Sequence, residues 1–164
     1  MTSGGAGMAV YRARIDWTLE EGADFPNGRY SRGHTVAFEQ HAVPATASRH
    51  VVGKKWAVEG AVDPEEMLVA SLSSCHMLTF LHMARLEGFA VTRYVDAAEG
   101  VMEKNAEGRL AITRVVLRPL ITYAGRRPTP EEADHLHHLA HEECFIANSV
   151  KTEIVVEEVQ PADA

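Results

Sequence analysis

The chain has 164 residues, and its 16 basic and 23 acidic side chains give a formal net charge of −7 at pH 7. This balance speaks against a nucleic-acid partner, because binding phosphates requires several Lys and Arg side chains. The length suits one domain, which we expect over residues 10–160 between flexible tails at 1–9 and 161–164. No basic region followed by an apolar block opens the chain, so we expect a cytoplasmic protein.

The first third of the chain predicts a β-hairpin followed by a long loop. Residues 10–19 alternate loosely and contain aromatic and β-branched side chains, which suits a strand. Turn-forming residues follow, and residues 34–39 are typical of the returning strand. Residues 40–61 lack clear periodicity except near 50–52, so we expect a loop there with room for one short strand.

The strongest helix signal covers residues 63–88. Asp63 can cap this helix, Pro64 suits its first position, and Gly88 is a typical stop. Residues 67–84 include no Asp, Glu, Lys or Arg, and apolar side chains occupy every face, so we expect burial all round. Serine, threonine and histidine interrupt the run, which favours a core helix over a membrane span. Since so short a chain has few elements to wrap such a helix, we expect a second copy to cover part of it.

The second half of the chain predicts another hairpin, a helix and a final strand. Residues 89–104 and 109–123 are strand-like and flank a turn signal, with one bulge expected in the second strand. Thr129 and Glu132 form a capping box at the start of a helix, and a short helical turn follows that helix. Residues 151–159 return as a strand. The order of elements indicates an α+β fold.

The chain has two cysteines, Cys75 in the middle of the long helix and Cys144 near the end of the second helix. In a reducing compartment two cysteines that meet are more often redox-active or metal-binding than structural, although two unrelated buried thiols are an alternative. A buried thiol keeps a pKa at or above about 8.5 unless a cation lies near it. Reactivity at Cys75 therefore requires a basic side chain from another element. The candidates lie in the first hairpin and the following loop: Arg29, Arg32, Arg49, Lys54 and Lys55.

Other residues allow further interpretations. Glu65 precedes Cys75 by about 15 Å along the helix, so it either holds an arginine for that site or only complements the helix dipole. His137, His141 and Cys144 share one helix face and, with Cys75, could bind zinc. A redox-responsive binding module, in which a disulfide changes an interface without turnover, is another alternative. His76 is more typical of a core histidine.

The ordered pattern of the chain resembles the OsmC/Ohr family of organic hydroperoxide reductases over residues 11–159. The resemblance rests on three features: a group of spaced residues that ends at the first cysteine, the strand pair after the long helix, and a second cysteine followed by a turn and a terminal strand. The spaced residues are Pro64, Glu65, Glu66, Leu68, Ala70 and Cys75. The resemblance implies an OsmC-like α+β fold with antiparallel sheets around a long buried central helix. It also implies an intertwined homodimer with active sites at the subunit interface.

The same resemblance implies a cofactor-free, thiol-dependent peroxidase that reduces organic hydroperoxides to alcohols. Cys75 would be the peroxidatic thiol that forms a sulfenic acid, and Cys144 would resolve it as a disulfide. Glu65 would pair with the catalytic arginine, for which Arg32 is the favoured match and Arg49 the alternative. A dithiol of lipoyl or thioredoxin type would reduce the disulfide.

Two positions depart from the family pattern. The first cysteine is commonly followed by an aromatic or small residue and the second by proline, but this chain has His76 and Phe145. These departures bear on substrate preference and activity.

Overall fold

A computed structural model describes residues 8–159. The chain divides into two compact units, Met1–Pro64 and Glu65–Ala164, and each is described by itself. The tails expected at 1–9 and 161–164 lie outside the described residues, except that residues 8 and 9 are described and form no helix or strand.

The first unit contains a three-stranded antiparallel sheet in the order β1 (Arg14–Asp16), β2 (His34–Ala37), β3 (Ala42–Ala45). The expected first hairpin is confirmed, with a shorter first strand. The one short strand of the following loop is β3, whereas residues 50–52 belong to a helical turn, α1 (Arg49–Val52). The Ser48 hydroxyl caps α1 by accepting a hydrogen bond from the His50 N–H. A single turn is too short to show a helical period, so the sequence pattern did not predict it.

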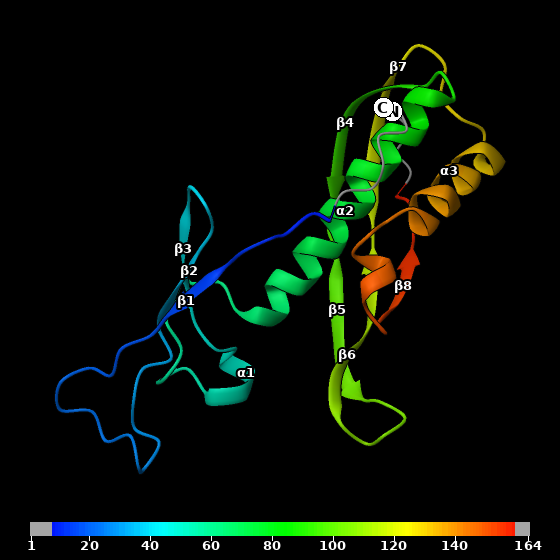
Figure 1. Cartoon of the computed structure of the whole chain (residues 1–164). Coiled ribbons are helices and arrows are strands. Elements are labelled where there is room, and N and C mark those ends of the chain that lie inside the picture. Colours follow the sequence, from blue (N-terminus) through cyan, green and yellow to red (C-terminus); the bar gives the residue numbers. More distant parts are fainter. Residues whose placement is uncertain (1–7, 160–164) are drawn as a thin grey trace. The chain divides into compact units, whose positions relative to one another are not determined.

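The second unit is organised along α2 (Pro64–Leu86), which confirms the helix expected over 63–88 (Figure 1). The chain leaves this helix at Gly88, whose φ of 79° lies in the left-handed region. The residues that α2 buries are Leu72, His76, Phe80 and Ala84. They follow one another at intervals of four and so form one stripe, whereas Leu78 is 60% exposed.

Burial of α2 on every face, as the apolar run predicts, does not occur within one chain. The physical reason is that the other elements of the second unit pack against one side of the helix only. Among the described residues α2 is also the one helix whose length and composition would allow it to cross a membrane, a test that core helices of soluble proteins pass as well. Coverage of the open side by a second copy stays a prediction.

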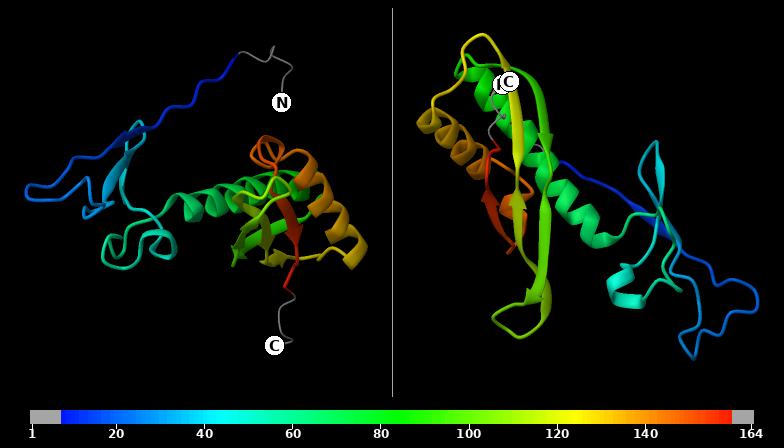
Figure 2. Two further views of the ribbon diagram at one scale, coloured as in Figure 1. Left: turned by 90° about the horizontal axis from the view of Figure 1, so that it is seen from below. Right: turned by 180° about the vertical axis from the view of Figure 1, so that it is seen from behind.

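The long second hairpin consists of two strand pairs. Its strands are β4 (Ala90–Asp96), β5 (Glu99–Lys104), β6 (Leu110–Leu117) and β7 (Pro119–Ala124), and β4 pairs with β7 while β5 pairs with β6, both antiparallel. Figure 2 shows the two pairs following one another along a single ribbon. The bulge expected in the second strand is confirmed, because the register shifts at Thr113, opposite Val101 and Met102.

The ribbon is interrupted where Asp96 bonds to two other segments. Its carboxylate accepts a hydrogen bond from the Ser73 hydroxyl of α2 and another, of 2.6 Å, from the Arg118 backbone N–H. The Arg118 N–H, which lies between β6 and β7, is thus satisfied by a side chain, and the Ser73 bond fastens the middle of the ribbon to the helix. The sequence showed one continuous strand-like run here because a single acidic residue is common at an exposed strand position.

The remaining elements are α3 (Pro130–Glu142), a 3₁₀ turn η1 (Ala147–Ser149) and β8 (Glu153–Val156). The capping box of Thr129 and Glu132 is confirmed. The expectation of purely antiparallel sheets is wrong, because β8 pairs in parallel with β6. The cause is the helix α3, which carries the chain across between β7 and β8 and brings it back in the direction of β6.

Two apolar clusters hold the second unit together. The first joins α2, α3 and the β4–β7 pair, and its buried members are Phe80, Ala84, Phe89, Ile121, Leu136 and Ala140. The second joins Leu72 of α2 to Val115 and Leu117 of β6, with side chains of β8 and of the two residues that flank η1 around them. Residues 75 and 76 of α2 therefore lie between Leu72 of the second cluster and Phe80 of the first, and His76 contacts His137 of α3.

Candidate active site

The two cysteines come together at the junction of α2 with the segment that follows α3. Both are free, and Cys75 lies near enough to Cys144 to act on its thiol. Cys144 is held in place by the turn after α3, where its own N–H donates to the His141 carbonyl and the Ala147 N–H donates to its sulfur at 3.4 Å. The fold thus brings together two thiols that lie 69 positions apart in the sequence.

The environments of the two thiols differ. Cys144 is buried, at 1% exposure, while Cys75 is half-buried. Burial, followed by the contact with Cys75, raises the pKa of Cys144 to about 11. Cys144 therefore remains a thiol at neutral pH, and the more accessible Cys75 is the better placed nucleophile.

Glu65 occupies the first turn of α2, ten residues before Cys75. One of its carboxylate oxygens, Oε2, is buried and has no hydrogen-bond partner among residues 8–159. A buried carboxylate oxygen is stable when a cation or another donor reaches it. The Glu65 side chain is therefore arranged to receive a donor.

Arg32 lies in the first unit, where the hairpin itself holds its side chain. The guanidinium donates to the carbonyls of Gly28 and Tyr30 and lies 3.7 Å above the centre of the Tyr30 ring. Tyr30 in turn packs against Trp17 and Phe25. Both hydrogen bonds of the Arg32 side chain come from Nη1. The pairing of Arg32 with Glu65 stays a prediction, as does the alternative with Arg49, which is the exposed first residue of α1.

A second polar contact joins α2 to α3 beside the thiols. His76 Nε2 lies 3.0 Å from His137 Nδ1, and His137 Nε2 lies 3.0 Å from Glu158 Oε2. His76 and His137 are 2% and 7% exposed, and the Phe80 ring packs on His137 at 4.5 Å. The sequence indicated a core histidine at 76 but gave no sign of Glu158, which follows the last strand and reaches His137 only through the fold.

The set that a zinc site would need is not assembled. His137 directs both ring nitrogens to His76 and Glu158, so neither is turned towards Cys75 and Cys144. Across residues 8–159 no three His, Cys, Asp or Glu side chains are grouped in a way that could hold a metal ion. The metal-binding alternative thus receives no support from the geometry.

We expect His76 to make the fold less stable in acid. Burial, then the charges of His137 and His141, lower its pKa from 6.5 to about 4. On acidification the unfolded chain protonates His76 at a higher pH than the folded chain does. The contribution of neutral His76 to the free energy of unfolding is therefore complete above about pH 6.5 and is lost as the pH falls towards 4. This loss corresponds to about 2–3 kcal/mol between pH 7 and 4.5.

Denaturant unfolding of wild type and His76→Gln at both pH values tests this expectation. The variant should be less stable at pH 7 and should lose less stability on acidification. The exposed His135 of α3 provides the control, because His135→Gln should leave the wild-type pH dependence unchanged. Equal acid sensitivity of wild type and His76→Gln would contradict the assignment.

Comparison with known proteins identifies relatives of this chain. The sequence model of the OsmC-like protein family matches residues 57–159. An OsmC-like protein of unknown function from Vibrio cholerae is 45% identical, with a TM-score of 0.89 over 93% of this chain and 100% of that one. No curated protein matches the chain.

Two more distant structures share the fold. An organic hydroperoxide resistance protein, OsmC, from Legionella pneumophila is 19% identical, with a TM-score of 0.62 over 94% of this chain and 100% of that one. An organic hydroperoxide resistance protein from Elizabethkingia anophelis, with thiocyanate bound, is 16% identical. Its TM-score is 0.63 over 94% of this chain and 99% of that one.

Proposed function

Because the chain belongs to the family of OsmC-like proteins, we propose that it is a thiol peroxidase that reduces organic hydroperoxides. The observation that carries the proposal is the proximity of the two cysteines, because the accessible Cys75 thiol lies near the buried Cys144 thiol. The names of the relatives from Legionella and Elizabethkingia agree with peroxide chemistry.

The proposed cycle uses both sulfurs and needs no cofactor. The Cys75 thiolate attacks the distal oxygen of the hydroperoxide, so that an S–O bond forms, the O–O bond breaks, and the leaving alkoxide takes a proton to become an alcohol. Cys144 then attacks the Cys75 sulfenic acid. An S–S bond forms, and the hydroxide leaves as water with the Cys144 proton. An external dithiol, of lipoyl or thioredoxin type, reduces the disulfide and restores both thiols.

An arginine and Glu65 complete the proposed site. The arginine, Arg32 in the favoured assignment, stabilises the Cys75 thiolate and orients the peroxide. Glu65 holds the guanidinium through a bidentate pair, and its buried, unpartnered oxygen supports this role. The open side of α2 supports an intertwined homodimer, in which a second copy covers the helix and borders the site.

The residues after the two cysteines bear on the proposed substrate. His76 is turned into the core towards His137, so it leaves the Cys75 face of α2 free. Phe145, in contrast, is 80% exposed beside Cys144. An exposed aromatic ring next to the reacting sulfurs favours a hydroperoxide with an apolar tail.

Peroxide consumption in the presence of excess dithiol tests the proposal. We expect the wild type to consume many equivalents of cumene hydroperoxide and to prefer it to hydrogen peroxide. Consumption that stops after one equivalent would instead indicate a redox-responsive binding module, and no consumption at all would refute peroxidase function. The control is protein whose thiols have been alkylated beforehand.

A further inference from the structure

One face of the β4–β7 pair carries two neighbouring tyrosines. Tyr94 of β4 lies directly opposite Ile121 of β7, and Tyr123 follows Ile121 by two residues. Side chains alternate between the two faces of a strand, and directly opposite residues share a face, so all three side chains point to the same side. This side belongs to the first apolar cluster, which packs against α2 and α3. The register of the pair therefore turns both tyrosines towards the interior of the second unit.

The protein itself does not satisfy the two tyrosine hydroxyls. Those of Tyr94 and Tyr123 are buried and have no hydrogen-bond partner among residues 8–159. Burial, followed by the charge of Glu158, raises the pKa of Tyr123 to about 12, so this hydroxyl keeps its proton at neutral pH. Burial, then the charges of Asp96 and Glu158, also raise the pKa of Tyr94. Buried hydroxyls in proteins are nearly always bonded to another group or to ordered water, because an unsatisfied one destabilises the fold.

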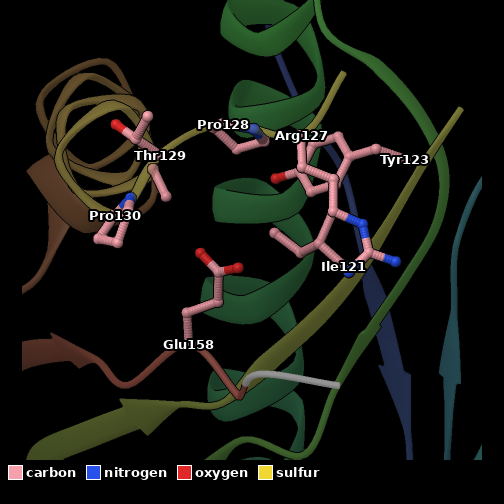
Figure 3. A pocket seen from close by; sticks show the side chains of 8 residues that line it. Ile121, Tyr123, Arg127, Pro128, Thr129, Pro130 and Glu158 are labelled. Atoms are coloured by element: carbon pink, nitrogen blue, oxygen red, sulfur yellow. The ribbon is translucent and has the colours of Figure 1, made fainter. Parts of the chain in front are cut away.

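Tyr123 borders a cavity of about 70 Å³, and the carboxylate of Glu158 points into the same space (Figure 3). The residues on either side of Glu158 pair with the ribbon through their N–H groups, which fixes the backbone there. Oε2 of Glu158 lies 3.0 Å from Nε2 of His137. A carboxylate has about four acceptor positions, so Glu158 can accept further hydrogen bonds from the cavity.

The start of α3 forms the opposite wall of the cavity and offers the tyrosines no free backbone N–H. Pro128 and Pro130 line this wall and have no N–H to donate. The N–H of Thr129, between them, already donates to the Glu132 carboxylate over 2.8 Å. Arg127 also lines the cavity.

A bridging molecule fits between Tyr123 and Glu158. The two side chains line one cavity but are not hydrogen-bonded to each other, and polar groups at such a separation are commonly joined by water. The cavity has room for more than one water molecule. Water both accepts and donates, as a hydroxyl facing a carboxylate requires. An anion would instead meet the charge of Glu158, and an apolar guest would leave the polar groups unsatisfied.

We propose that this cavity is a binding site for ordered water, in which one small cluster accepts from the hydroxyls of Tyr94 and Tyr123 and donates to the Glu158 carboxylate. The cluster joins β4 and β7 to the segment after β8 and, through Glu158, to His137 of α3. This inference does not depend on the reaction of the two cysteines, so it stands or falls separately from the proposed function.

A high-resolution crystal structure tests the site directly. We expect water oxygens within about 2.7–3.2 Å of the Tyr123 hydroxyl and of the Glu158 carboxylate. The same positions should be filled in crystals grown from different precipitants, which separates water from an adventitious additive. A dry cavity, a bound anion, or a Tyr123 hydroxyl that bonds directly to Glu158 would overturn the proposal.

Denaturant unfolding of Tyr123→Phe measures what the water contributes. Loss of the hydroxyl removes one hydrogen bond to the cluster, so the equilibrium constant for unfolding should rise about fivefold. Tyr94→Phe should act similarly. The double variant should show less than the product of the two single effects, because both hydroxyls bind one cluster.

Tyr11→Phe is the matched control, because Tyr11 is 91% exposed and its hydroxyl meets solvent in the folded and the unfolded chain alike. Its unfolding constant should equal that of the wild type. A Tyr123→Phe protein that is as stable as the wild type would show that the hydroxyl makes no hydrogen bond and would contradict the water site. Single effects that multiply fully would contradict a shared cluster.

Discussion

Cys75→Ser is expected to abolish the reduction of organic hydroperoxides, with a loss on the order of 10⁴-fold in turnover. The thiolate is the nucleophile, and a serine hydroxyl in the same position remains protonated because its pKa is far above that of a thiol. The substitution replaces one sulfur by oxygen on a half-buried helix position, so the fold should persist. Cumene hydroperoxide consumption with excess dithiol measures the effect.

The neighbouring Ser74 provides the control for this prediction. It is exposed on the same turn of α2, and Ser74→Ala should retain wild-type turnover. Thermal unfolding of both variants shows whether the helix is intact. If folded Cys75→Ser turns over peroxide at the wild-type rate, Cys75 is not the peroxidatic residue.

Cys144→Ser is expected to separate the two halves of the cycle. The first equivalent of peroxide should still be reduced, because Cys75 is present, and the sulfenic acid should then persist for lack of a second thiol. Steady-state turnover should fall by about 100-fold or more, since an external thiol replaces one that the fold holds near Cys75. Intact mass, with a dimedone adduct, identifies the sulfenic acid.

Cys144→Ala distinguishes the loss of the resolving thiol from the effect of a buried hydroxyl. Cys144 is 1% exposed, so serine places a new polar group in the core, whereas alanine does not. Both variants should trap the sulfenic acid to the same extent. Wild-type turnover in folded Cys144→Ala would show that another group resolves Cys75.

The elements that the sequence predicted were those with strong local signals. The proline at the first position, the uncharged run and the stop at Gly88 mark α2, and the capping box of Thr129 marks the start of α3. The parallel pairing of β8 with β6 could not be predicted, because parallel partners are chosen by the crossover of the chain and not by the strand itself. At the interruption of the ribbon Asp96 accepts hydrogen bonds from Ser73 and from the Arg118 N–H, and no local pattern encodes these contacts.

The candidate site was predictable only in part, because most of its contacts depend on the fold and not on a local sequence pattern. The cysteines stand out as residue types, but their contact was implied by the family resemblance and not by their spacing. His137 and His141 share a helix face with Cys144, which suggested a metal, whereas the fold directs His137 to His76 and Glu158. Glu158 has no sequence signal because its role depends on the position of the chain after β8.

The most direct test of the central claim, that Cys75 and Cys144 form one redox couple, is to count thiols after the reduced protein has met one equivalent of cumene hydroperoxide. The account predicts that both thiols disappear together and that intact mass shows the loss of two hydrogen atoms without added oxygen, as in an intramolecular disulfide. Two thiols that survive unreacted would contradict it and leave the chain with the fold of its family but without this chemistry.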